Sequence, residues 1–186
     1  MTNEIVSTQM ANDMELSKIF AESGIFPDIK SAAQGYVKVL AGRELGLSPM
    51  QSINSFYFVN GKLGIAAQTM GALVKKSGKY DYKIISHSTE ECTLEFFKIG
   101  NPPDVLGRST FDLKMAAKAG IVNGTAWKNY PMNMLLARAL MNGIRWMCPD
   151  AVSAFLYSIE ELQDLEPEKK ESTVTITTDG EVSNGT

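Results

Sequence analysis

The residues in this sequence whose types and spacing suit ligand binding are bases that stand among aromatic rings. Trp127, Lys128 and Tyr130 place a lysine between two rings. Lys114 and Lys118 are four residues apart, so they share one face if their segment is helical. Lysine ammonium groups contact phosphates, and exposed aromatic rings stack on unpaired bases. These residues therefore favour a single nucleic acid strand as the ligand.

Further bases extend this pattern. Lys75, Lys76 and Lys79 cluster at the end of an expected helix, where they oppose the negative end of its dipole and can also reach phosphates. Arg138 and Arg145 fall on one side of another expected helix. Two alternatives to nucleic-acid binding stay open. Lysines at a helix end often serve only as caps, and Trp127 could belong to the core. The candidate DNA-binding residues are Lys75, Lys76, Lys79, Arg108, Lys114, Lys118, Trp127, Lys128, Tyr130, Arg138 and Arg145.

The net charge of −3 conceals zones of opposite sign. Residues 30–145 hold fifteen Lys and Arg against seven Asp and Glu, which is a net charge of +8. Residues 1–29 and 146–164 each carry −4, and residues 165–186 carry −3. A basic middle region between acidic ends predicts an anionic partner for the middle region, with chance zoning on a solvated surface as the alternative.

Catalysis is poorly supported by the motifs. His87 is the one histidine, and neither it nor the two cysteines, Cys92 and Cys148, has metal-ligand spacing, so we expect no metal site. Gly61 and Lys62 lack the rest of a phosphate-binding loop, so neither ATP nor another cofactor is indicated. A two-metal nuclease site remains possible in principle from the carboxylates of the middle region, which are Asp81, Glu90, Glu91, Glu95, Asp104 and Asp112.

Hydrophobic spacing and turn residues predict an α+β fold. We expect a helix capped by Asp13 after a frayed start, a second opened by Pro27 and Asp28, and the longest helix beginning at Pro131. Asn60 and Gly61 predict a tight hairpin. The expected helices cover residues 13–23, 28–45, 49–55, 66–76, 112–118, 131–147 and 158–165, and the expected strands 56–59, 62–65, 80–84, 92–99 and 105–110. The expected buried residues of the first two helices are Leu16, Ile19, Phe20, Ile29, Ala33, Tyr36, Val37 and Leu40.

These elements predict one domain over residues 1–165, with its core in 28–162 and a small antiparallel sheet of three or four strands packed with several helices. Residues 166–186 are rich in Glu, Thr, Ser and Gly, which predicts a disordered acidic tail. We identify no signal peptide and no apolar stretch long enough for a membrane span. Reduced cysteines then favour a cytoplasmic location.

Two blocks of motifs resemble a known family. The first is Gly42-Arg-Glu-Leu-Gly-Leu-Ser-Pro-Met50, followed by Val59-Asn-Gly-Lys62 and by a helix ending in Lys75-Lys-Ser-Gly78. The second begins at Trp127-Lys128 and continues through Arg138 to Cys148-Pro-Asp150 and Tyr157-Ser-Ile-Glu-Glu-Leu162. In order and spacing, over about residues 32–162, these blocks resemble the phage-type RecT single-strand annealing recombinases of the RecT/Redβ group.

The resemblance implies an α+β core that assembles into rings or helical filaments. It also implies ATP-independent binding of single-stranded or newly annealed DNA in a bacterial host cell, usually beside a partner exonuclease. Our hypothesis is that the basic residues hold a strand by its phosphates while its bases pair with a complementary strand. The alternatives are a phage protein-binding module that acts on a host protein, and a metal-dependent nuclease.

Overall fold

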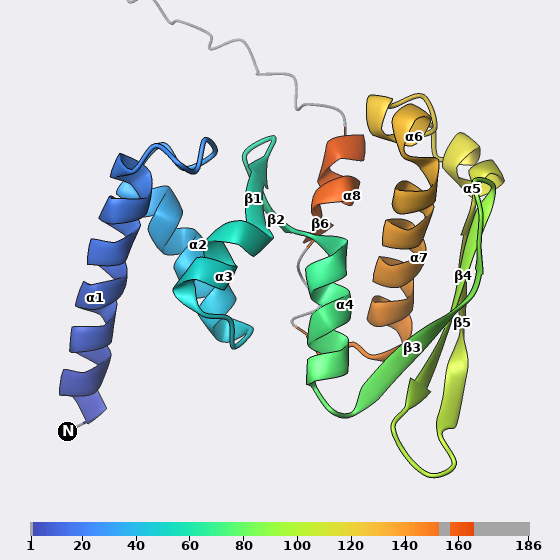
Figure 1. Ribbon diagram of the computed structural model, residues 1–186, viewed down its shortest axis with the longest axis horizontal. Coiled ribbons are helices and arrows are strands. Elements are labelled where there is room, and N and C mark those ends of the chain that lie inside the picture. Colours follow the sequence, from blue (N-terminus) through green and yellow to red (C-terminus); the bar gives the residue numbers. More distant parts are fainter. Residues whose placement is uncertain (1, 153–156, 166–186) are drawn as a thin grey trace, which may run out of the picture.

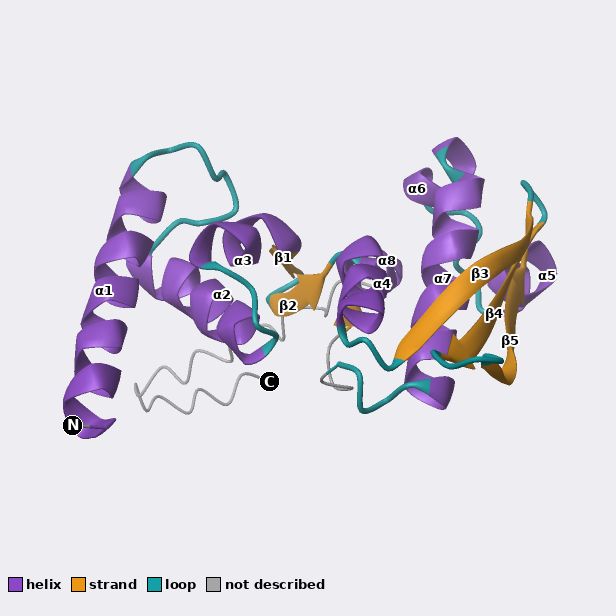
Figure 2. Ribbon diagram, turned by 60° about the horizontal axis from the view of Figure 1, so that its bottom comes forward, coloured by secondary structure: helices purple, strands orange, loops and turns teal. Residues whose placement is uncertain are grey.

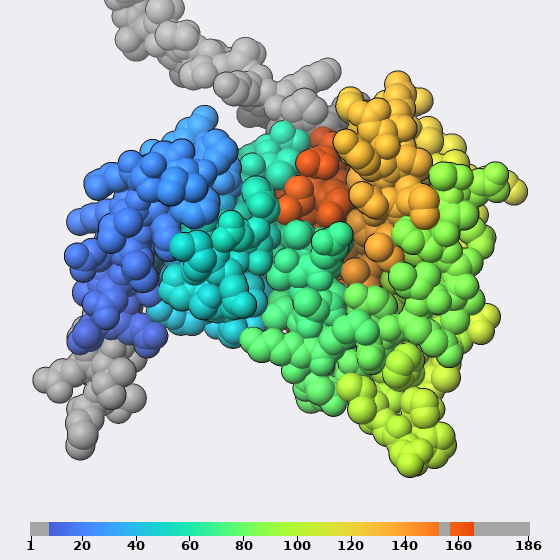
Figure 3. Space-filling model, viewed as in Figure 1, coloured from blue at the N-terminus to red at the C-terminus, as the bar shows by residue number. Residues whose placement is uncertain are grey.

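The computed structural model of the protein describes residues 2–152 and 157–165, with side chains from residue 8 onward. It has an α+β fold in which a layer of three helices forms one end of the molecule and a three-stranded sheet forms the other (Figures 1 and 3). The described residues form eight helices and two small sheets of three strands each. The expected α+β class is confirmed, and the strands are divided between two sheets.

The N-terminal layer consists of the helices α1 (Thr2–Glu22), α2 (Ala32–Glu44) and α3 (Pro49–Ser55). Its small core is formed by Phe20, Ile29, Val39 and Ile53. Glycines let the helices approach closely: a Cβ added to Gly35 would lie 3.1 Å from the Ser17 carbonyl oxygen, and one added to Gly42 would lie 1.8 Å from Ser52 Oγ. The glycines thus bring the three helices close together around this small core.

The first helix differs from the expectation at its start. It begins at Thr2, so the frayed segment over residues 1–12 and the Asp13 cap were wrong. No Gly or Pro interrupts residues 2–22, and nothing local ends the helix before Gly24. Asp13 instead lies within the helix, is only 3% exposed and forms an ion pair with Arg43 of α2. A carboxylate expected to cap one helix therefore links two helices.

The second helix also begins later than expected. Ser31 is its N-cap and accepts a hydrogen bond from the Gln34 amide. Asp28 does not open the helix, because its carboxylate accepts a hydrogen bond of 2.5 Å from Lys38 Nζ. Lys38 is fully buried, and its ammonium also donates to the Ile53 carbonyl oxygen and lies 5.0 Å from the centre of the Tyr57 ring.

The face of α2 that lies in the core is not the expected apolar one. Gly35, Lys38, Val39 and Gly42 are buried. Val37 and Leu40 are 45% and 36% exposed. Close helix packing favours the side with glycines, so the larger apolar side chains point away from the core. On α1, Phe20 is buried as expected, but Leu16 and Ile19 are exposed. Among the described residues, the N-terminal layer thus leaves several of its large apolar side chains exposed.

The hairpin and its neighbours follow the sequence closely. Ser48 caps α3 through a complete capping box with Gln51. Strands β1 (Phe56–Val59) and β2 (Lys62–Ile65) pair in antiparallel around Asn60 and Gly61, whose φ angles of 51° and 76° suit a tight two-residue turn. Strand β6 (Tyr157–Ser158), which we did not expect, adds to β2 in parallel.

The second sheet is covered by the helix that packs against it. Helix α4 (Ala67–Lys76) leads into strands β3 (Tyr80–His87), β4 (Glu91–Lys98) and β5 (Asp104–Asp112), which pair in the antiparallel order β3-β4-β5. Helix α7 (Pro131–Met147) lies along one face of this sheet (Figure 2). Gly143 permits that contact, because a Cβ there would lie 2.1 Å from Phe96 Cε2.

The remaining helices are short. Helix α5 (Leu113–Lys118) is capped by Asp112 as expected. Helix α6 (Thr125–Asn129) occupies a segment that we expected to be a loop. Ser158 is the N-cap of α8 (Ile159–Asp164). Helix α7 has the expected bounds, but α1 is longer, with 21 residues against 17. The expected disordered tail lies outside the described residues. No helix within the described residues is long and apolar enough to cross a membrane.

Candidate nucleic-acid interface

The segment from α5 to the first turn of α7 holds five of the expected DNA-binding residues. Asp112 Oδ1 accepts a hydrogen bond of 2.7 Å from the Met115 amide, which fixes the start of α5. The Phe111 ring packs against the Trp127 ring with centroids 6.2 Å apart, so the end of β5 and α6 lie together. Four of these five are exposed: Lys114, Lys118, Lys128 and Tyr130.

These three lysines are exposed and make no ion pair within the described part of the chain. Lys114 and Lys118 share one face of α5, as their spacing predicts. Tyr130 is 63% exposed at the start of α7. Helices α5, α6 and the first turn of α7 gather near one end of the molecule (Figure 1). The elements that carry the lysines and Tyr130 therefore lie near each other, as joint phosphate contact and base stacking on one strand would require.

Trp127 has a different role from the one expected. It is 2% exposed and belongs to the main hydrophobic core. Its Nε1 donates a hydrogen bond of 2.9 Å to Asp164 Oδ1 of α8. The ring therefore cannot stack on a base in this arrangement, and it fixes α6 against α7 and α8. Of the two aromatic residues that flank Lys128, the exposed Tyr130 is the one that a strand could reach.

The arginines of α7 face α8 instead of solvent. Arg138 forms an ion pair with Asp164 and lies 3.7 Å from a Glu161 oxygen. Arg145 makes two hydrogen bonds to the Glu161 carboxylate, of 2.5 and 2.6 Å. The side chains of Arg138 and Arg145 are 17% and 29% exposed. The stripe predicted to track a DNA backbone is thus occupied by carboxylates of the same chain.

The contact between Arg145 and Glu161 shifts the pKa of both residues. Burial by itself raises the pKa of Glu161, but hydrogen bonds from Arg145 and from the Ser158 amide outweigh it, and the pKa lies below its usual range. The same hydrogen bond raises the pKa of Arg145. Glu161 is therefore ionised at neutral pH and holds α8 against α7.

Of the expected bases outside α5, α6 and α7, all but Lys76 are paired with carboxylates of the same chain. Lys75 forms an ion pair with Asp81, and Lys79 Nζ lies 3.2 Å from Asp150 Oδ2. Arg108 Nε lies 2.8 Å from Glu95 Oε2, and Lys83 also contacts that carboxylate, so the two bases hold the pKa of Glu95 below its usual range. Lys76 donates to the Gly46 carbonyl oxygen at 2.9 Å. A continuous track through all eleven expected residues does not form.

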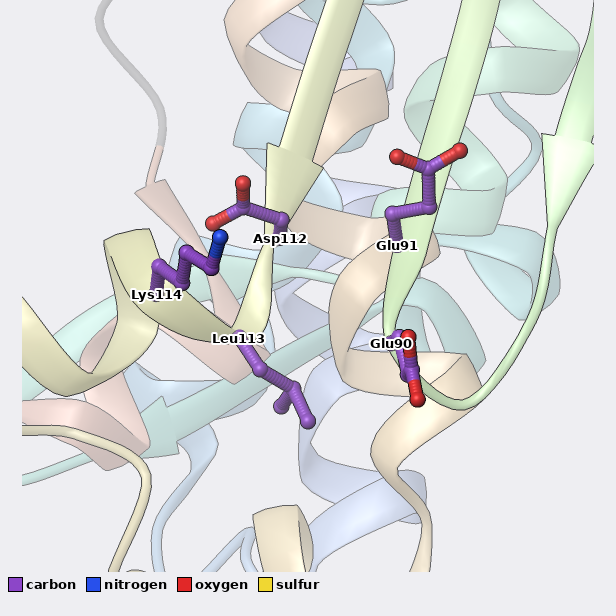
Figure 4. A pocket seen from close by; sticks show the side chains of 5 residues that line it. All are labelled: Glu90, Glu91, Asp112, Leu113 and Lys114. Atoms are coloured by element: carbon purple, nitrogen blue, oxygen red, sulfur yellow. The ribbon is translucent and has the colours of Figure 1, made fainter.

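The carboxylates of the nuclease alternative are dispersed. Asp81 and Glu95 are held by bases, as described above. Glu90, Glu91 and Asp112 line a cavity of about 350 Å³, but the side chains of Glu90 and Glu91 point in opposite directions (Figure 4). Asp112 is occupied as the cap of α5. No group of three or more metal-ligating side chains occurs among the residues that the structure describes.

His87 contacts a backbone carbonyl of a neighbouring element, and the two cysteines are buried. His87 Nε2 lies 3.0 Å from the Met132 carbonyl oxygen and joins the end of β3 to the start of α7. Cys92 and Cys148 are buried and form no disulfide. Burial raises the pKa of each thiol to about 11, so neither is an activated nucleophile.

A cavity beside Tyr130 was missed by sequence reasoning. It has a volume of about 650 Å³ and lies between α6, the start of α7 and α8. Asn129, Asn133 and Gln163 line it with carboxamide groups. Single carboxamides have no sequence signature, and α6 was expected to be a loop. Only the fold brings residue 163 next to residues 129 and 133.

Comparison of the chain with protein-family models, with curated proteins and with solved structures found no match. The resemblance to the annealing recombinases therefore remains a prediction from the sequence motifs.

Proposed function

We propose that the protein binds single-stranded DNA without ATP and promotes annealing of complementary strands in phage-type homologous recombination. The observation that carries this proposal is the group of exposed lysines near Tyr130, which have no ion pair among the described residues. They lie in a chain whose other expected bases are mostly neutralised. We name Lys114, Lys118, Lys128 and Tyr130 the lysine–tyrosine surface.

We place the proposed phosphate contacts on the lysines and not on the arginines of α7. Lysines that form no ion pair among the described residues release counterions when they meet phosphates, whereas Arg138 and Arg145 would first have to leave Glu161 and Asp164. The lysine–tyrosine surface is small, so each copy holds few nucleotides. Several copies along one strand would supply the avidity that one copy lacks. We therefore propose that the protein acts as a homo-oligomer, in the cytoplasm of a bacterial host cell and beside a partner exonuclease.

The proposed oligomer has a candidate contact surface at the opposite end of the molecule. Ala33, Val37 and Leu40 form an exposed apolar stripe on α2, which we name the α2 stripe. Met10 and Met14 on α1 are also about half exposed. An apolar surface of this kind suits contact with another protein. It equally supports the second candidate function, binding to a host protein, which would use the α2 stripe and leave the lysines without a nucleic acid ligand.

Salt dependence of DNA binding tests the proposal. Fluorescence anisotropy with a labelled single strand should show affinity that falls steeply with salt. Replacing Lys114, Lys118 and Lys128 by Ala should reduce the magnitude of the logarithmic salt slope by about 2, because each phosphate contact on a single strand contributes about 0.7. Annealing of two complementary labelled strands, without a nucleotide cofactor, should slow in the same variant.

A matched control variant carries Lys75→Ala, Lys79→Ala and Arg108→Ala. It loses the same formal charge, but from bases already paired with Asp81, Asp150 and Glu95. We expect its salt slope and annealing rate to stay close to those of the wild type. Equal losses in both variants would show that net charge, not the lysine–tyrosine surface, drives binding. No binding by the wild type at low salt would refute DNA binding and favour the host-protein alternative. Shortened strands in the presence of magnesium would favour the nuclease.

A further inference from the structure

The cavity between α6, α7 and α8 is a candidate ligand site that adjoins the lysine–tyrosine surface through Tyr130. Its volume of about 650 Å³ is in the range of small-molecule sites in proteins. Its polar lining comes from three elements: Thr125 and Asn129 on α6, Asn133 on α7 and Gln163 on α8. Met134, which is 3% exposed, contributes an apolar wall. The site thus combines an apolar wall with several polar groups.

The polar groups suit a planar, uncharged ligand. Each carboxamide offers both a donor and an acceptor, and the edges of nucleobases present the same combination. Asn129, Asn133 and Gln163 are exposed and use no side-chain hydrogen bond within the described residues. Their donors and acceptors are therefore available to a ligand.

The one charged residue in the lining is already neutralised. Asp164 accepts the hydrogen bond from Trp127 through Oδ1 and forms the ion pair with Arg138 through Oδ2. The cavity therefore presents no unpaired charge, which disfavours an ionic group as its occupant. A phosphate would instead be drawn toward Lys128, which follows Trp127 on α6.

Tyr130 completes the arrangement. It lines the cavity, and its ring is 63% exposed and makes no stacking contact with another ring among the described residues. A base that enters the cavity could stack on this ring, and aromatic stacking of this kind is tolerant of base identity. The adjacent carboxamides could then favour some base edges over others.

From this lining we propose that the cavity takes one unstacked nucleobase of a single DNA strand. Tyr130 stacks on the base, and the carboxamides of Asn129, Asn133 and Gln163 contact its edge. Lys128 contacts an adjacent phosphate. This inference rests on the proposed binding of single-stranded DNA and adds that each copy holds a base as well as phosphates. One held base would fix the position of the strand on the protein and leave its neighbours available for pairing.

Strands that lack bases test the inference. An oligonucleotide that is abasic at every position keeps every phosphate of the matching poly-dT strand. In fluorescence anisotropy at one salt concentration, we expect the wild type to bind the poly-dT strand about tenfold more tightly than the abasic strand, in keeping with the effect of one stacked base. Tyr130→Ala should abolish this difference by weakening poly-dT binding alone, and Tyr130→Phe should keep it.

Two further variants locate the effect. Trp146→Ala removes another exposed aromatic ring from α7, 65% exposed and near the other end of the helix, and should leave both affinities unchanged. Asn133→Ala should alter the ratio of affinities for poly-dT and poly-dC while leaving abasic binding unchanged. Thermal unfolding by circular dichroism checks that each variant is folded.

The outcomes separate the two proposals. If the wild type binds both strands equally, or if Tyr130→Ala weakens both equally, the base site is refuted while DNA binding stands. If the wild type binds neither strand at low salt, DNA binding is refuted and the base site with it. A tenfold preference that survives Tyr130→Ala but disappears in Trp146→Ala would place base contact elsewhere and also refute the inference.

Discussion

The two ends of the molecule are stabilised in different ways. The sheet β3-β4-β5 and α7 share the main core, in which Leu94, Phe96, Leu135 and Leu140 are each at most 2% exposed. The N-terminal layer buries four apolar side chains among the described residues and adds the Lys38–Asp28 ion pair. It exposes Val37 and Leu40 on α2. The core of the sheet end is therefore larger than that of the N-terminal layer, while among the described residues both ends expose large apolar side chains, including Val105 and Trp146 at the sheet end.

The difference extends to charge. At the sheet end, six bases are matched by carboxylates of the same chain, whereas Lys76, Lys98 and the lysines of α5 and α6 form no ion pair among the described residues. In the N-terminal layer, the bases Lys38 and Arg43 are used to join helices through Asp28 and Asp13. The lysine–tyrosine surface, which adjoins the sheet end, and the α2 stripe of the N-terminal layer thus lie on different parts of the molecule (Figure 1).

The strongest test of the comparison replaces one large aliphatic residue in each core by alanine. Leu135 on α7 and Ile53 on α3 are 0% and 1% exposed, and each loses the same number of carbon atoms. We expect Leu135→Ala to lower the free energy of unfolding by about 4 kcal/mol and Ile53→Ala by about 2 kcal/mol, because a small core near solvent collapses more easily around a cavity. Urea unfolding followed by circular dichroism measures both values. Equal losses would mean that the two cores are equally well packed.

The next test concerns the buried lysine. Asp28→Ala leaves the Lys38 ammonium with the Ile53 carbonyl oxygen and the Tyr57 ring as its neighbours. We expect a loss of about 3 kcal/mol, because breaking a buried ion pair leaves one charge uncompensated. The double variant Asp28→Ala, Lys38→Met removes both charges and should recover most of the loss. If the double variant is less stable than Asp28→Ala, the ammonium is stabilised by contacts other than Asp28.

These two tests bear on what the sequence could predict. Helices and strands with strong local signals were predicted well: Ser48-Pro49 at α3, Asn60-Gly61 at the hairpin, Asp112 at α5 and Pro131 at α7. Each depends on a few neighbouring residues. The start of α2 was wrong because Asp28 is used by Lys38, ten residues away. A local rule cannot include a partner that only the fold supplies.

The candidate site was predictable only in part. Sequence reasoning placed Lys114, Lys118, Lys128 and Tyr130 among the binding residues, and the structure leaves them exposed. It also included Arg138 and Arg145, whose partners on α8 lie at least 16 residues away along the chain. Charge zoning counts bases and acids by position, so it cannot show that the acidic segment folds back onto the basic helix. The carboxamides beside Tyr130 gave no signal for the same reason.

A third test measures how the stability contributed by the Glu161 contact between α7 and α8 depends on pH. The pKa of Glu161 is lowered in the folded protein, so its contribution to stability is complete above the ordinary value of 4.5 and is lost as the pH falls through the folded-state pKa. We expect Glu161→Gln to cost about 2 kcal/mol at neutral pH, since hydrogen bonds to charged groups are worth about that much. The cost should shrink as the pH falls below about 4.5.

Tryptophan fluorescence provides the measurement. In a Trp146→Phe background, Trp127 is the one remaining tryptophan, and its Nε1 donates to Asp164 in α8. Its emission should stay constant from neutral pH to about pH 5 and change at lower pH as α8 detaches. Glu161→Gln in the same background should remove the acid dependence of this step. A change in emission between pH 7 and pH 6 would contradict a lowered pKa for Glu161.

The smallest effect on stability is expected at the α2 stripe, and it bears most directly on why the two ends differ. Val37→Glu places a charge on a side chain that is already 45% exposed, so the free energy of unfolding of the single chain should change by less than about 0.5 kcal/mol. Self-association should nevertheless weaken, because burying a carboxylate in an apolar contact is costly. Ala11→Glu, at an exposed position of α1, makes the same charge change and should leave association intact. Sedimentation velocity over a range of concentrations distinguishes the two variants. If Val37→Glu assembles like the wild type, the α2 stripe is not the contact between copies, and a protein of another kind becomes the better candidate to cover it.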